Sequence, residues 1–162
     1  MQSRHFIAAT LGAVALTFGA PTQPAYAHHC FKDVFDANAP IAITGKIIAV
    51  EWVNPHALIH VSGAEPGLAA KDWMFWAATP NTLLRLKLNR AALEAGTEVT
   101  IRGYKAKDTS CAVSPATNAP ACKADGRELT LSDGKAYHIA SGGDGGPDGG
   151  TCMWKNSATS PN

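Results

Sequence analysis

The stretch IAITGKIIAVEWVNPHALIHVSGA, residues 41–64, decides the fold of this chain. Its first half is rich in β-branched residues and repeats with a period of two, which is typical of a β-strand. Asn54-Pro55 ends that strand, because proline lacks the N–H that a sheet needs and restricts the residue before it. A second strand is expected over residues 57–62. One face of the first strand carries Ile41, Ile43, Gly45, Ile47, Ala49 and Glu51.

The residues that follow predict a third strand and then a short helix. DWMFWAAT, residues 72–79, alternates so that Trp73 and Phe75 share one face. In TPNTLLRLKL, residues 79–88, Thr79 can cap a helix whose first turn holds Pro80, and four leucines form an apolar stripe. One more helical turn is expected over residues 89–96, ended by Gly96.

The C-terminal half returns to the period of strands. TEVTIRGYKA, residues 97–106, alternates strictly, and residues 127–140 predict a hairpin with Asp133-Gly134 as its turn. Three strands, a short helix and further strands match a five- to six-stranded Greek-key barrel of the OB type, with a small open sandwich as the alternative. We expect this all-β domain over residues 28–140. A glycine-rich tail, 141–162, would begin as a flexible linker.

The first 27 residues have the pattern of a secretory signal peptide. Arg4 is their only charge, residues 6–20 are apolar or small, and Ala25-Tyr26-Ala27 fits a cleavage site. The apolar run is shorter than the roughly 20 residues that a membrane-spanning helix needs. We therefore expect a periplasmic or secreted protein that begins at His28 and has no membrane association after cleavage.

Composition excludes several classes of function. The chain has 14 Lys and Arg against 13 Asp and Glu, and loss of Arg4 would balance the two. A nucleic-acid partner would need a more basic surface. The sequence also lacks Gly-x-Ser-x-Gly, His-Glu-x-x-His and phosphate-loop motifs, which favours a non-catalytic protein whose partner is a metal ion or a small molecule.

Four cysteines, Cys30, Cys111, Cys122 and Cys152, allow three disulfide pairings. Disulfides persist in exported proteins. We favour Cys111 with Cys122, which closes a short loop rich in Ser, Pro and Ala, and Cys30 with Cys152, which ties the tail to the N-terminus. A zinc cluster is disfavoured because no Cys-x-x-Cys spacing is present.

His28, His29 and His56 form the candidate metal site. A chain that begins at His28 offers an α-amine, with a pKa of about 7.7–8.0, and a ring nitrogen from the same residue. A further imidazole from His29 or His56 would give a nitrogen-rich planar set, which favours Cu(II). Asn54 could support a ligand histidine by hydrogen bonding without binding the metal itself. Copper is therefore the expected cofactor.

The alternative is a ligand- or protein-binding barrel without a metal. Trp52 and Trp76, bordered by Tyr104, could form an aromatic platform for such a partner, although aromatic residues at a period of two are more often part of a core. His60 and His138 are expected to be structural, since His60 would lie about 13 Å along a regular strand from His56.

Three stretches resemble a large family of exported bacterial proteins of unknown function. They are AHHCF at residues 27–31, GKIIAVEWVNPHALIHV at 45–61 and the block from Trp76 to Asp108. The resemblance covers about residues 27–140 and implies no activity. Cys30 stands where the family usually has serine, and the loop between Cys111 and Cys122 resembles an addition. The resemblance assigns motif positions to His28, His29, Trp52, Asn54, Pro55, His56, Trp76, Pro80, Asn81 and Arg90.

Overall fold

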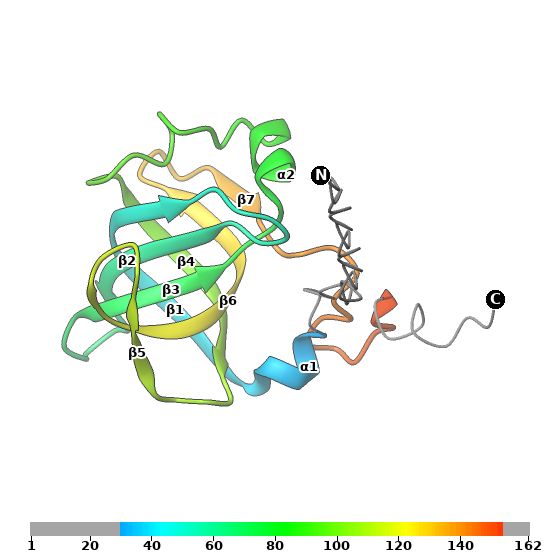
Figure 1. Cartoon of the computed structure of the whole chain (residues 1–162). Coiled ribbons are helices and arrows are strands. Elements are labelled where there is room, and N and C mark those ends of the chain that lie inside the picture. Colours follow the sequence, from blue (N-terminus) through cyan, green and yellow to red (C-terminus); the bar gives the residue numbers. More distant parts are fainter. Residues whose placement is uncertain (1–29, 154–162) are drawn as a thin grey trace, which may run out of the picture.

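Strands dominate the computed structural model, which describes residues 30–153 (Figure 1). The expected signal peptide, His28, His29 and residues 154–162 lie outside the described residues. The elements are α1 Phe31–Val34, β1 Phe35–Glu51, β2 Leu58–Ala64, β3 Lys71–Trp76, α2 Pro80–Arg85, β4 Glu98–Ala106, β5 Cys111–Ser114, β6 Ala119–Leu131 and β7 Ala136–His138.

Five strands close into a ring. β1 pairs antiparallel with β2 and β4, β2 pairs with β3, and β4 pairs with β6. The ring closes where β3 and β6 run parallel, with Trp73 opposite Cys122 and Trp76 opposite Asp125. This is the closure of an OB-type barrel, in which no strand of the ring keeps an unpaired edge. The expected fold, with a short helix between the third and fourth strands, is confirmed.

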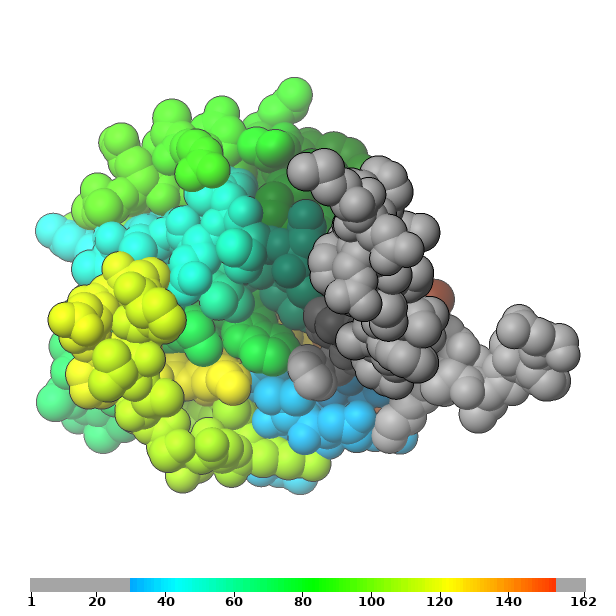
Figure 2. Space-filling view, viewed as in Figure 1, coloured from blue at the N-terminus to red at the C-terminus, as the bar shows by residue number. Residues whose placement is uncertain are grey.

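The segment between β4 and β6 is an insertion that contains one further strand. The sequence predicted only a loop here, but β5 pairs with β6, with Cys111 opposite Cys122 and a disulfide between them. Ser114 at the end of β5 is buried. Figure 2 shows the insertion in yellow-green at the molecular surface, next to the blue residues of α1.

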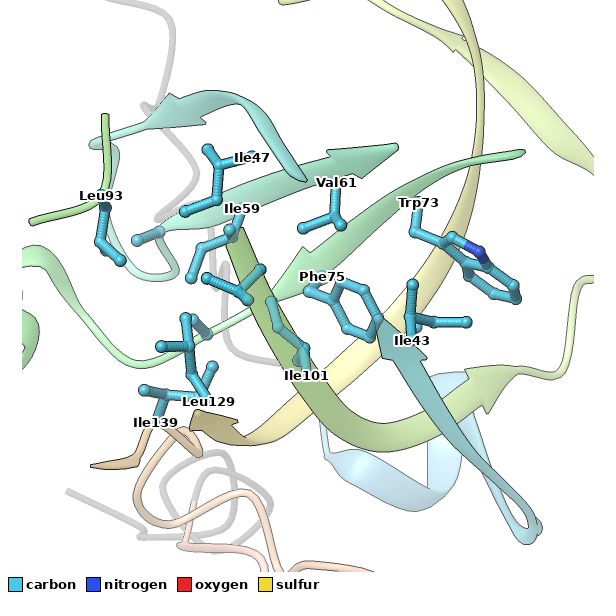
Figure 3. Close-up of a cluster of buried hydrophobic side chains, with 14 of the residues drawn as sticks. Ile43, Ile47, Ile59, Val61, Trp73, Phe75, Leu93, Ile101, Leu129 and Ile139 are labelled. Atoms are coloured by element: carbon cyan, nitrogen blue, oxygen red, sulfur yellow. The ribbon is translucent and has the colours of Figure 1, made fainter. Parts of the chain in front are cut away.

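The core lies between the inward faces of the strands, where side chains from β1, β2, β3, β4 and β6 point toward one another (Figure 3). Ile43, Ile59, Phe75, Ile101 and Leu129 are each 0% exposed. Burial of one such side chain contributes about 1.5–3 kcal/mol, so this cluster is the main source of stability. The predicted face of Trp73 and Phe75 is confirmed, since Met74 and Trp76 are less buried.

A β-bulge at Ile48 changes which residues of β1 face the core. Ile47 pairs with Val61 and Ala49 pairs with His60, so Ile48 is an extra residue. A bulge of this kind shifts the alternation by one position. The sequence pattern placed Glu51 on the face of Ile47, and this expectation was wrong: Glu51 lies on the outer face beside His60.

The α2 segment begins as the sequence predicted but ends at Arg85, three residues before the expected end at Leu88. The Thr79 hydroxyl accepts a hydrogen bond from the Thr82 amide, and Pro80 occupies the first turn. Leu83 and Leu88 are fully buried in the main core, whereas Leu84 is exposed. The helical turn after α2 is also present, because the Leu93 amide donates to the Asn89 carbonyl. Among residues 30–153, no helix is long and apolar enough to cross a membrane.

A disulfide between Cys30 and Cys152 joins the two ends of the described chain, as favoured from the sequence. Residues 141–153, which the sequence predicted to begin as a flexible linker, make specific contacts with the barrel and with α1 in this structure. Asp144 is only 7% exposed, and its carbonyl accepts a hydrogen bond from the Phe31 amide at 2.8 Å. The glycines of this segment adopt positive φ at Gly143, Gly145, Gly146 and Gly149, which lets the chain fold back on itself.

Candidate functional site

His56 lies in the turn between β1 and β2 and is held on two sides. Its imidazole stacks on the Trp76 indole, with ring centroids 5.2 Å apart and an angle of 21° between planes. Its Nδ1 donates to the Ala77 carbonyl at 3.3 Å. A neutral imidazole with its proton on Nδ1 carries a lone pair on Nε2, so these contacts select the tautomer that would bind a metal through Nε2.

The same tryptophan connects His56 to the N-terminal segment. Trp76 meets Phe35 edge to face at 5.5 Å, and Phe35 lies 5.7 Å from Phe31. Tyr104 completes this second cluster with an edge contact of 5.3 Å to Phe31. Cys30 directly precedes Phe31, is 3% exposed and is fixed by its disulfide. The cluster thus lies between His56 and the residue that follows His28-His29.

The remaining candidate ligands are not part of a metal cluster in the described residues. His28 and His29 lie outside those residues, and Asn54 is exposed on the loop. Within residues 30–153, no three His, Cys, Asp or Glu side chains are grouped to hold a metal ion. Further donors for a site that uses His56 would therefore have to come from outside residues 30–153 or from solvent.

The three aromatic residues suggested as a ligand surface are divided between two clusters. Trp76 and Tyr104 pack against Phe31 and Phe35, whereas Trp52 packs against the main core under the guanidinium of Arg90 at 5.3 Å. All three are partly buried. Much of their area is thus engaged within the protein itself.

A buried polar group that the sequence did not predict surrounds His60. This residue is 0% exposed, its Nε2 lies 2.8 Å from the Glu51 carboxylate, and its Nδ1 lies 3.4 Å from the Ser114 hydroxyl. Ser114 is 3% exposed and accepts a hydrogen bond from the Ala116 amide, so it is not placed to attack a substrate. The group instead fastens the insertion to β2. The sequence could not predict this group because it did not reveal the bulge at Ile48, which brings Glu51 to the side of His60.

A second unpredicted group lies in the middle of β6. Arg127 pairs with Asp125 on its own strand and with Asp144 of the C-terminal segment. Burial raises the pKa of Asp125 to about 7, and the nearby Asp144 charge acts in the same direction, while Arg127 acts against it. The spacing of Asp125 and Arg127, two residues apart on one strand, is only a weak sequence indication of an ion pair. Asp144 gave no indication at all, because it lies in a glycine-rich stretch without a periodic pattern.

The fold and the cysteines define a class: a small, disulfide-bonded β-barrel of the OB type with an N-terminal aromatic cluster. Residues 17–114, more than half of the chain, match the model of DUF6152, a family of unknown function, and the protein belongs to this family. No curated protein and no solved structure matches the chain at a significant level.

Proposed function

We propose that this protein is an exported, non-catalytic metal-binding barrel that holds one copper ion through His28, His29 and His56. The observation that carries the proposal is the row of ring contacts from His56 through Trp76 and Phe35 to Phe31. These contacts connect His56, the candidate ligand that lies within the described residues, to the aromatic cluster that contains Phe31, the residue after Cys30.

Covalent geometry keeps the two N-terminal histidines close to Cys30. His29 and His28 are one and two residues before Cys30, so their Cα atoms fall within about 4 and 8 Å of the Cys30 Cα. Cys30 itself is held by Cys152 and is buried. A clamp at this point lowers the conformational entropy that the preceding residues lose when they bind a metal.

The donor set favours copper over other divalent ions. The α-amine and imidazole of His28, with one or two further imidazoles, supply only nitrogen ligands, which suit the square-planar preference of Cu(II). The amine must lose a proton to bind, so its pKa near 8 allows binding near neutral pH. This donor set requires cleavage after Ala27. The two disulfides support export, because such bonds persist in oxidising compartments.

The decisive experiment compares two N-termini. The protein is expressed with its own signal peptide, purified from the periplasm without a tag, and its first residue is checked by mass spectrometry. A second version keeps Ala27 before His28. We expect one Cu(II) per chain in the first version and binding at least a hundredfold weaker in the second, because an amide replaces the amine.

Histidine variants locate the site on the barrel. His56→Ala should weaken Cu(II) binding at least tenfold, whereas His138→Ala, which removes a histidine of β7 outside the proposed ligand set, should leave the affinity unchanged. Equal affinity for the two N-terminal versions would refute the site. Absence of any Cu(II) binding by the version that begins at His28 would instead favour the metal-free, ligand-binding alternative.

A further inference from the structure

Two carboxylates share one guanidinium at the end of the barrel where α1 lies. Arg127 Nε donates to Asp125 Oδ2, while Arg127 Nη2 donates to Asp144 Oδ2 at 2.7 Å. The side chains of Asp125, Arg127 and Asp144 are 3%, 16% and 9% exposed. With both carboxylates ionised, the cluster carries one negative charge more than positive, in a place from which water is largely excluded.

A buried net charge is costly, and the cluster can remove it by binding a proton. Asp125 is the site for that proton, because burial raises its pKa to about 7. Among the described residues, Arg127 lowers this pKa by its charge and Asp144 raises it. The other titratable groups on the elements around the cluster are Lys32 and Asp33 of α1, Lys71 and Asp72 of β3, Glu98, Arg102, Tyr104 and Lys105 of β4, Lys123 and Glu128 of β6, Tyr137 and His138 of β7, and Asp148 of the C-terminal segment.

The cluster also holds the two ends of the described chain. The Arg127 guanidinium lies over the Phe31 ring at 4.9 Å, and the Phe31 amide donates to the Asp144 carbonyl. The Asp144 carboxylate accepts a hydrogen bond from the Gly146 amide at 3.0 Å. Displacement of Arg127 from Asp144 would therefore loosen both α1 and the segment that leads to Cys152.

We propose that Asp125, Arg127 and Asp144 form a proton-sensitive junction, which holds α1 and residues 141–153 on the barrel tightly when protonated and loosely when not. With the proton bound, Arg127 and Asp144 form a neutral ion pair beside an uncharged Asp125. Without it, Asp125 and Asp144 repel each other and compete for Arg127. The junction uses none of the proposed metal ligands, so it goes beyond the metal-binding proposal and stands or fails independently of it.

The test is NMR on the metal-free protein with both disulfides formed, between pH 5.5 and 8.5. The Asp125 carboxyl ¹³C shift should titrate with a midpoint near 7. Over the same range, protection of the Phe31 amide from hydrogen exchange, corrected for the intrinsic rate, should fall at least tenfold. The Ile101 amide lies in the main cluster and exchanges on global unfolding, so its protection should fall only by the factor that denaturant unfolding gives over the same pH range and should stay above that of Phe31.

Three variants make the test specific. Asp125→Asn mimics the protonated side chain and should abolish the pH dependence of Phe31 protection. Asp144→Asn removes the repelling charge and should lower the midpoint of the Asp125 titration, while burial keeps it above the ordinary value. Glu128→Gln removes an exposed carboxylate of the same strand and should change nothing. The proposal is overturned if Asp125→Asn keeps the original pH profile, or if the Asp125 carboxyl titrates near 4 in the unmodified protein.

Discussion

The imidazole of His56 and the indole of Trp76 form a nearly parallel stack with 5.2 Å between ring centroids. The two residues come from different elements, the β1–β2 turn and the end of β3, and the barrel brings them together. Trp76 is therefore both a support for the candidate ligand and a spectroscopic probe next to it.

Copper at His56 should quench the fluorescence of Trp76. Cu(II) is paramagnetic and would lie within a few ångströms of the stacked indole, so titration should reduce tryptophan emission with a stoichiometry of one. Trp76→Phe should remove most of that quenching, whereas Trp52→Phe, in the other aromatic cluster, should retain it. Equal quenching in the two variants would place the metal elsewhere.

Ser114→Ala should destabilise the protein by about 1–3 kcal/mol, because it leaves the buried His60 Nδ1 without its hydroxyl partner. The measurement is urea unfolding at neutral pH. Ser62→Ala is the matched control, since Ser62 is exposed on the same strand as His60, and its effect should stay within about 0.5 kcal/mol. A similar loss in both variants would show that the hydrogen bond does not fasten the insertion.

Asp125 should make the protein less stable as pH rises from about 4 to 7. Its pKa is raised from 3.8 to about 7 on folding, so in this window the folded state holds a proton that the unfolded chain has lost. The contribution is complete below pH 4 and is lost as pH rises through 7. Relative to Asp125→Asn, the unmodified protein should lose up to a few kcal/mol across this range, as measured by denaturant unfolding. A constant difference between the two would contradict the assigned pKa.

The two disulfides should differ in their contributions. Cys30–Cys152 spans 122 positions and Cys111–Cys122 spans 11, and the longer loop restricts the unfolded chain more. Replacement of the first pair by alanines should therefore cost about 2 kcal/mol more than replacement of the second. Unfolding of the two double variants under oxidising conditions gives the comparison, and the opposite order would be inconsistent with this account.

The sequence predicted the barrel because the strands of the ring show an alternation of apolar and polar residues that can be read locally. Proline or glycine residues mark several of the turns between them. The Cys111–Cys122 disulfide was predicted, but the β5 strand was not, because residues 111–114 carry no strong strand pattern and Ser114 contacts His60, which is 54 residues away. The bulge at Ile48 escaped because the sequence allows β1 either to continue its alternation through Ala49 and Glu51 or to shift it by one residue after Ile47. Only the pairing with β2 decides between them.

The candidate site was predictable in part. The position of His56 after Asn54-Pro55 marked it as the end of a strand, yet its support by Trp76 depends on the pairing of Leu58 with that tryptophan. Arg127 could not be assigned a partner, because Asp144 lies in a glycine-rich stretch with no periodic pattern. Contacts between distant segments were the part that single-sequence reasoning could not supply.

The Cys30–Cys152 bond has a mechanical consequence. A pulling force applied to the chain before residue 30 and after residue 152 would pass through that bond and bypass the barrel strands. Under oxidising conditions the domain would transmit tension as a rigid link of fixed length. After reduction of this bond, the force would act on the barrel strands themselves. Unfolding of the barrel would then release roughly 400 Å of chain.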